Sequence, residues 1–126
     1  MTPIVRQRLP ATVHSVPEAR HTALAALRDA GYADQDLLDD VALGLSEAVG
    51  NVARHAYPGG AGHVEVEVRA AGAGVIVVVA DNGSGMDAPS ESPGLGLGLQ
   101  LIRSKTRRWN VESDCNGTRL TMQFGG

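Results

Sequence analysis

One stretch of the sequence, LGLSEAVGNVARHAY at residues 43–57, carries polar residues at spacings that could do chemistry. Glu47, Asn51 and His55 recur every four residues, so they share one stripe of a helix. An asparagine oxygen is a good neutral ligand for Mg²⁺, which takes oxygen ligands and keeps waters beside substrate phosphates. A glutamate one turn away could then act as a general base. The stretch therefore predicts a site for a metal and for proton transfer.

The alternative is a solvated helix face, and the pattern taken alone favours it. Such a face usually carries Lys, Arg and Glu pairs, whereas this stripe also holds Asp40 and Gly44. Asparagine is also a poor residue for a helix interior. The opposite face suits a packed core, since it consists of Leu45, Ala48, Val49 and Val52.

A second candidate feature is VVVADNGSGMD, residues 77–87, in which Asp81 ends an apolar run. A carboxylate there could accept a hydrogen bond from an exocyclic amine, such as that of adenine, between apolar walls. Gly83 and Gly85 would let the chain approach closely or adopt positive φ. Taken alone, the pattern is as typical of a plain turn. It is not a calcium loop, because the spaced acids and the terminal Glu of that motif are absent.

A third feature is GLGLGLQLI, residues 94–102, where Gly94, Gly96 and Gly98 precede helical periodicity. Free backbone N–H groups at the start of a helix can hold phosphate. The stretch follows no strand of a βαβ unit and lacks Gly-Lys-Ser/Thr, so neither a dinucleotide fingerprint nor a P-loop is indicated. Residues 82–98 hold five glycines, which favours a flexible lid, with a plain linker as the alternative.

The surrounding sequence predicts the elements that must position these residues. Ser15 and Glu18 are spaced as a capping box, and Asp34 can cap the next helix. The expected elements are a strand at 4–11, helices at 15–30 and 35–56, strands at 63–70 and 75–81, a helix at 99–108, and strands at 109–115 and 118–124. The run at 75–81 predicts a central strand covered on both faces or nearly so. The order predicts an α+β two-layer sandwich, with helices on one face of a mostly antiparallel sheet.

Composition narrows the class of protein. A chain of 126 residues suits one domain, 1–126, with one core. A net charge of −3 and 3% aromatic residues give no basic footprint and no base-stacking platform, so nucleic acid and anionic membrane are disfavoured as partners. No apolar run is long enough to span a membrane, and the N-terminus does not resemble a signal peptide. The single Cys115 excludes an internal disulfide, so a cytoplasmic location is expected.

The order of the three features is more specific than any one of them. E-x-x-x-N on a helix, D-x-G-x-G after a strand, G-x-G-x-G before a helix and a late Gly117-Thr118 together resemble the histidine-kinase-like ATPase superfamily, which has the Bergerat fold. The resemblance runs from Leu9 to the final strand. It is closest to the bacterial anti-sigma-factor serine/threonine kinases, whose motif helix carries E-A-V-x-N-x-x-x-H-x-Y, as residues 47–57 do here.

The resemblance implies a role for each matching position. Asn51 would hold the Mg²⁺ bound to the ATP phosphates, and Glu47 would deprotonate the acceptor. Asp81 would contact the adenine amine, and Thr118 would support the adenine through Asp81 or water. The remaining nucleotide-binding positions that the resemblance implies are His55, Gly83, Gly85, Gly94, Gly96, Leu97 and Gly98.

The identity of residue 47 separates the branches of this family. Sensor histidine kinases usually have Asn there, because an imidazole nitrogen is already nucleophilic, whereas a hydroxyl has a proton to lose. Glu47 therefore favours transfer to serine or water, and the lack of phosphoacceptor helices and of a transducer domain favours the free-standing serine kinases. Gly50 departs from the small polar residue expected in the motif. It leaves room beside the site and lowers helix stability by about 1 kcal/mol relative to Ala.

By this resemblance the protein is expected to be a cytoplasmic, homodimeric Mg²⁺-ATP-dependent protein serine kinase and anti-sigma factor. Its implied partners are a STAS-domain antagonist, which it phosphorylates on serine, and a sigma factor, which it sequesters. Arg20 and His21 could belong to the partner surface or to a solvated face. Two alternatives stay open: a nucleotide-binding partner-switching module with little or no kinase activity, and an ATPase fragment of a larger machine.

Overall fold

The computed structural model describes residues 3–55, 62–83, 100–114 and 117–125. Seven long elements follow one another along the chain, and residues 100–105 form a further short helical segment between β3 and β4. The elements are β1 (Val5–Pro10), α1 (Ser15–Asp29), α2 (Gln35–His55), β2 (His63–Ala71), β3 (Gly74–Asp81), β4 (Arg108–Asp114) and β5 (Gly117–Phe124).

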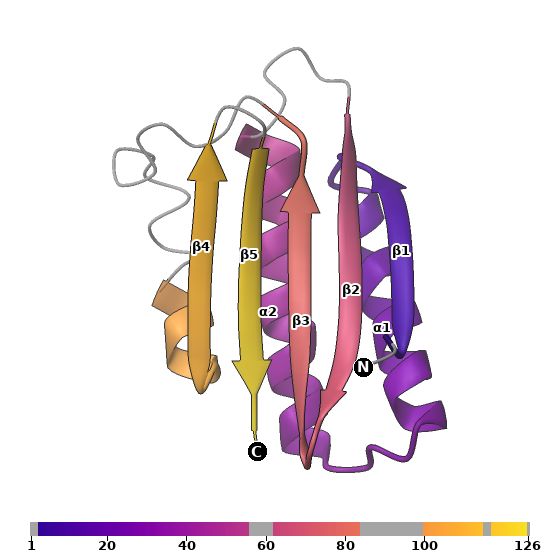
Figure 1. Cartoon of the computed structure of the whole chain (residues 1–126). Helices are drawn as coiled ribbons and strands as arrows, with labels where there is room; N and C mark the ends of the chain where they lie inside the picture. The colour runs from indigo at the N-terminus through magenta and orange to yellow at the C-terminus, as the bar shows by residue number, and fades with distance from the viewer. Residues whose placement is uncertain (1–2, 56–61, 84–99, 115–116, 126) are drawn as a thin grey trace.

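The strands form one sheet in the order β1-β2-β3-β5-β4, and every neighbouring pair is antiparallel. Both long helices lie on the same face of this sheet (Figure 1). α1 packs against β1 and α2, and α2 packs against β3 and β5. The predicted α+β two-layer sandwich with helices on one face is therefore confirmed.

The core lies between the helices and the inner face of the sheet. Alternate residues of the strands point into it, as the period of a half-buried strand requires. Each fully buried Val or Leu contributes about 1.5–3 kcal/mol relative to an exposed one. The strands contribute Leu9, Val64, Val66, Val68, Val75, Val77, Val79, Leu120, Met122 and Phe124, and the two long helices contribute Ala19, Ala23, Leu27, Leu37, Leu38, Val41, Leu45, Ala48, Val49 and Val52.

Two members of the polar stripe of α2, Gly44 and Asp40, face β5 and the segment at 100–105. Gly44 is buried, and a Cβ on it would lie 2.6 Å from Cζ of Phe124. A larger residue at this point would push α2 off the sheet. Earlier in the helix, Asp40 Oδ1 lies 4.0 Å from Lys105 Nζ. Because glycine has no side chain at residue 44, α2 can approach β5 closely at this point.

The helix starts agree with the sequence prediction in one case and differ in the other. Asp34 Oδ1 accepts a hydrogen bond from the N–H of Asp36 at 3.0 Å, so the predicted cap of α2 is confirmed. The capping box predicted for α1 is wrong. His14 stands at the N-cap without a side-chain hydrogen bond, and Ser15 Oγ instead donates to the carbonyl of Pro10 at 2.6 Å. That hydrogen bond ties the start of α1 to the end of β1.

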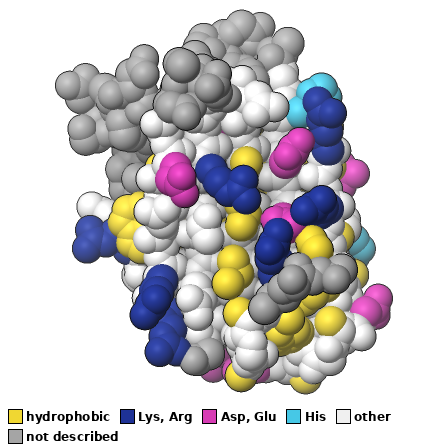
Figure 2. Space-filling view, viewed as in Figure 1, with side chains coloured by type: hydrophobic (Ala, Val, Ile, Leu, Met, Phe, Trp, Pro, Cys, Tyr) yellow, Lys and Arg dark blue, Asp and Glu magenta, His cyan; other side chains and the backbone are white. Residues whose placement is uncertain are grey.

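The outer face of the sheet is not covered by α1 or α2, yet no residue of β3 is exposed there, so the predicted central strand covered on both faces or nearly so is confirmed. Val78 is 8% exposed on this face, and Ile76 and Ala80 are half-buried. Figure 2 shows hydrophobic side chains along the middle of this face, with charged side chains around them. Arg6 and Arg69 both donate to Oε1 of Glu67 at 2.9 Å, and the bond from Arg69 is the main cause that lowers the pKa of Glu67.

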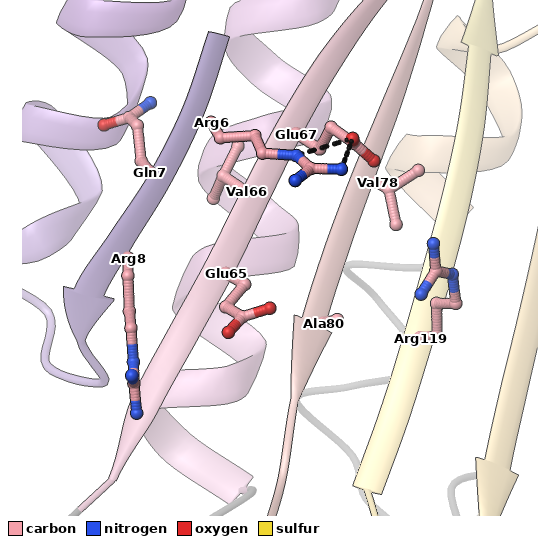
Figure 3. Close-up of a pocket in the computed structure, with 9 residues that line it drawn as sticks. All are labelled: Arg6, Gln7, Arg8, Glu65, Val66, Glu67, Val78, Ala80 and Arg119. Atoms are coloured by element: carbon pink, nitrogen blue, oxygen red, sulfur yellow. Dashed lines mark hydrogen bonds and ion pairs between the residues drawn. The ribbon is translucent and has the colours of Figure 1, made fainter. Parts of the chain in front are cut away.

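Charged side chains also line a hollow of about 350 Å³ on this outer face, shown in Figure 3. None of the site residues predicted from the sequence lines it. Its lining residues are Arg6, Gln7, Arg8, Glu65, Val66, Glu67, Val78, Ala80 and Arg119. The hollow is therefore separate from the chemistry that the motifs predict.

Candidate functional site

The predicted site residues that the structure describes gather at one end of the molecule. β3 ends, β5 begins and α2 ends at this same end (Figure 1). Asp81 at the end of β3 is paired with Thr118 at the start of β5. Glu47 and Asn51 lie in the last turns of α2, which packs on both strands. Motifs far apart in sequence are thus brought to one edge of the two layers.

Asp81 offers a buried acceptor at the end of the central strand. Its side chain is 6% exposed, and Oδ1 accepts a hydrogen bond from the N–H of Gly83 at 2.9 Å. Oδ2 has no hydrogen-bond partner among the residues that the structure describes. Burial raises the pKa of Asp81, while the N–H groups of Gly83 and Thr118 act in the opposite direction without satisfying Oδ2.

An unpaired acceptor of this kind suits a ligand that donates. Leaving a buried polar group without a hydrogen bond costs about 1–3 kcal/mol, so native structures rarely keep one without a reason. An exocyclic amine donates N–H and would satisfy Oδ2. The unpaired acceptor at Asp81 therefore fits the adenine contact that the resemblance implies.

Gly117 and Thr118 hold β5 close to Asp81. Gly117 has φ +138, and a Cβ on it would collide with the carbonyl oxygen of Asp81. Only glycine adopts this backbone readily and leaves that space. Thr118 is buried, and its Oγ1 shares a hydrogen bond of 3.0 Å with Oγ of Ser113 on β4. Gly117 belongs to the motif identified in the sequence, but the motif assigns it no role of its own, and its contact with Asp81 supplies one.

Asn51 and Glu47 differ in exposure. Asn51 is 3% exposed, whereas Glu47 is half-buried. Oδ1 of Asn51 accepts a hydrogen bond from Nη2 of Arg54 at 3.1 Å. Arg54 was missed from the sequence, because the motif leaves its position unspecified. The room that Gly50 leaves is filled by this guanidinium, whose Nη1 would lie 3.2 Å from a Cβ at residue 50.

The helix residues fit a magnesium site with few protein ligands. Within the described ranges no group of three or more His, Cys, Asp and Glu could hold a metal ion. Mg²⁺ in phosphate-binding sites commonly takes one or two protein oxygens and completes its shell with waters and substrate phosphates. One amide oxygen from Asn51 suits that arrangement.

Several predicted positions lie outside the description. Gly85, Gly94, Gly96, Leu97 and Gly98 fall within residues 84–99, which the structure does not describe. His55 is the last residue of α2, and its side chain is not described either. The predicted roles of these residues stay predictions.

Comparison with known proteins places the chain in a family. Residues 9–124 match the family described as the histidine kinase-like ATPase domain. The match covers most of the chain, so the chain belongs to this family. No curated protein matches it.

Solved structures share the fold. The RsbU and RsbW domains of Rv1364c from Mycobacterium tuberculosis match with a TM-score of 0.77 at 23% identity, over 98% of this chain and 32% of that chain. The histidine kinase domain of the Erythrobacter litoralis blue-light activated kinase EL346 matches with a TM-score of 0.58 at 21% identity, over 91% and 60%.

The Acinetobacter baumannii histidine kinase AdeS matches with a TM-score of 0.53 at 14% identity, over 96% of this chain and 67% of that chain. The chain thus spans about a third of the Rv1364c structure and more of the two kinases. At these identities the likeness concerns the fold alone. In the described part of the chain, no helix has both the length and the apolar character needed to cross a membrane.

Proposed function

We propose that this histidine-kinase-like ATPase domain is a Mg²⁺-ATP-dependent protein serine kinase that acts as an anti-sigma factor. The observation that carries the proposal is that three polar side chains lie at the same end of the fold. A buried carboxylate, Asp81, ends the central strand and has one oxygen without a partner among the described residues. A buried amide, Asn51, and a half-buried carboxylate, Glu47, lie on the helix packed against that strand.

Each side chain has a distinct task in this proposal. Asp81 would bind the adenine amine, and Asn51 would hold the Mg²⁺, which offsets charge on the ATP phosphates during transfer. Glu47 would accept the proton of the acceptor hydroxyl, a step that serine needs because its hydroxyl is a weak nucleophile until it is deprotonated. A histidine acceptor would not need that base, so Glu47 favours a hydroxyl acceptor.

The partners are proposed from the motif helix. The string at residues 47–57 follows the E-A-V-x-N-x-x-x-H-x-Y pattern of the anti-sigma-factor kinases. The proposed acceptor is therefore a serine on a STAS-domain antagonist. Phosphorylation would release the antagonist and leave the kinase free to hold a sigma factor. By the same precedent the kinase would act as a cytoplasmic homodimer.

Single-turnover phosphate transfer tests the proposal. Wild type, Glu47→Ala and Glu47→Gln would be mixed with γ-labelled Mg²⁺-ATP and with each STAS-domain protein of the source organism. Transfer to serine is expected in the wild type. It should fall by at least about 10²-fold in both variants, because a positioned base contributes about 10²–10⁴-fold. Calorimetric titration of Mg²⁺-ATP should show unchanged affinity in both.

The other outcomes separate the alternatives. Transfer that survives Glu47→Ala would remove Glu47 from the base role. ATP binding without any transfer in the wild type would support the partner-switching module. ATP turnover with no partner present would favour the ATPase fragment. If a folded wild type binds no ATP, the nucleotide site itself is wrong.

A further inference from the structure

We propose that Arg54 is a built-in competitor for the metal: its guanidinium caps the oxygen of Asn51 and opposes the binding of Mg²⁺ there. Gly50 provides the space in which it rests. This inference rests on the proposed nucleotide site. It gives Arg54 and Gly50 control over how strongly Mg²⁺ raises the affinity for ATP. The family motif leaves residue 54 unspecified and does not expect glycine at residue 50.

The contact itself is specific. Arg54 lies three residues after Asn51 on α2, so the two side chains are neighbours on the helix surface. Nη2 of Arg54 donates to Oδ1 of Asn51 at 3.1 Å. Arginine has donors but no acceptor, so the contact orients the amide with its oxygen toward Arg54. That oxygen is the atom a metal would take.

Burial makes this hydrogen bond necessary in the free protein. Asn51 is 3% exposed, so solvent can do little to satisfy its oxygen. Buried acceptors without partners are rare because they destabilise the fold. Arg54 itself is exposed, so it can supply the hydrogen bond at rest and swing into water when something else binds Asn51.

Gly50 lets the guanidinium lie flat on the helix. A Cβ at residue 50 would lie 3.2 Å from Nη1, 3.4 Å from Nη2 and 3.6 Å from Cζ of Arg54. All three nearest atoms belong to the same guanidinium, and the closest of these distances is tighter than an ordinary contact. A Cβ at residue 50 would therefore force the guanidinium of Arg54 to shift by a few tenths of an ångström without removing its charge.

The guanidinium and Mg²⁺ compete at this oxygen because of their charge. An amide oxygen has two lone pairs, but two cations bound to it would lie close together and repel each other. Arginine does not lose its charge at accessible pH, so the competition is present throughout. Mg²⁺ alone should consequently bind poorly, and it should bind well only with the phosphates of ATP.

The test measures the metal enhancement, defined as the ATP dissociation constant in EDTA divided by that in Mg²⁺. Calorimetry would compare wild type, Arg54→Met and Gly50→Ala. Arg54→Met is expected to raise the enhancement by about threefold to tenfold, the equivalent of one typical net hydrogen bond, and Gly50→Ala should raise it by less, because it shifts the guanidinium without removing it. Gly50→Ala keeps the charge of Arg54, so a rise there reports the contact and not the charge alone.

Two further variants serve as controls. Arg20→Met removes the same charge from α1, where Nη1 of Arg20 lies 3.4 Å from Oγ of Ser46 on α2, and should leave the enhancement unchanged. Asn51→Ala should reduce the enhancement on its own. In that background Arg54→Met should have no further effect, because the shared oxygen is gone.

The failures of the two proposals can be told apart. A folded wild type that binds no ATP overturns the proposed function and this inference together. If ATP binds with an enhancement that depends on Asn51, but Gly50→Ala leaves it unchanged, only the role of Arg54 is overturned. A lower enhancement in Arg54→Met would also overturn it, since Arg54 would then assist the metal. Melting without ligand checks folding, and Arg54→Met should melt lower because Asn51 loses its partner.

Discussion

Asp81 and Asn51 are both buried oxygen acceptors at the same end of the fold, yet the protein treats them differently. Asp81 belongs to the sheet and keeps one oxygen without a partner in the described structure. Asn51 belongs to a helix and has its oxygen capped by Arg54. Strand register holds Asp81 in place against Thr118, so no side chain needs to close over it. On the helix, a long exposed side chain can close over the acceptor and open again.

The difference has an energetic side. Asp81 is charged when ionised, and its burial disfavours that form, which is why its pKa is raised. Asn51 is neutral, so its burial requires a hydrogen bond but no charge. The proposed adenine contact at Asp81 therefore costs stability, whereas the proposed metal ligand Asn51 avoids much of that cost through its hydrogen bond with Arg54.

The largest expected effect is on stability, and it concerns Gly117, which lies against Asp81 in the sheet. Gly117→Ala should lower the free energy of unfolding by about 3–5 kcal/mol, because it combines a strained backbone with a collision against the Asp81 carbonyl. Urea unfolding would measure it. Gly72→Ala is the matched control, with φ +62 but nothing within 4 Å of the added Cβ, and should lose only about 1–2 kcal/mol. Equal losses would mean that the close approach to Asp81 does not matter.

Asp81→Asn should have the next largest effect, on binding. An Asn side chain that accepts from Gly83 turns its amide donor toward the position of the adenine amine, so two donors would meet. The ATP affinity should fall by about 10-fold to 100-fold, the equivalent of a hydrogen bond to a charged group. Calorimetry with Mg²⁺-ATP and with the guanine nucleotide would measure it. A variant that binds ATP normally would remove Asp81 from the adenine site.

The same variant has an opposite effect on stability. A carboxyl whose pKa is higher in the folded state than in the unfolded state binds more protons when folded, so stability falls as pH rises between the two values. At neutral pH, Asp81→Asn should therefore raise the free energy of unfolding. Its advantage should shrink as pH falls and Asp81 becomes protonated. Urea titrations across this acid range would show an advantage that is independent of pH if burial of the charge is not the cause.

Much of the fold could be predicted from local sequence patterns. The features that could not be predicted depend on contacts between residues that the fold brings together. The alternation at 63–70 and the cap at Asp34 are local, and the structure has both. Ser15 looked like a cap but bonds Pro10, because β1 folds back beside it. Gly117 matters only because Asp81, far away in sequence, lies against it. Arg54 is local, yet its role needs the burial of Asn51, which the helix pattern alone does not show.

Thr118→Val should have the smallest effect, and it asks how much of the adenine site depends on the carboxylate alone. The substitution keeps the shape and the N–H beside Asp81 but removes the hydroxyl that bonds Ser113. The free energy of unfolding should fall by about 1 kcal/mol, and ATP should bind about threefold to tenfold more weakly if the hydroxyl also supports the adenine. Thr121→Val, on the outer side of the same strand, is the control and should change neither quantity. A loss of stability with unchanged ATP affinity would mean that the hydroxyl of Thr118 only links β5 to β4. Asp81 would then bind the adenine without help from that hydroxyl.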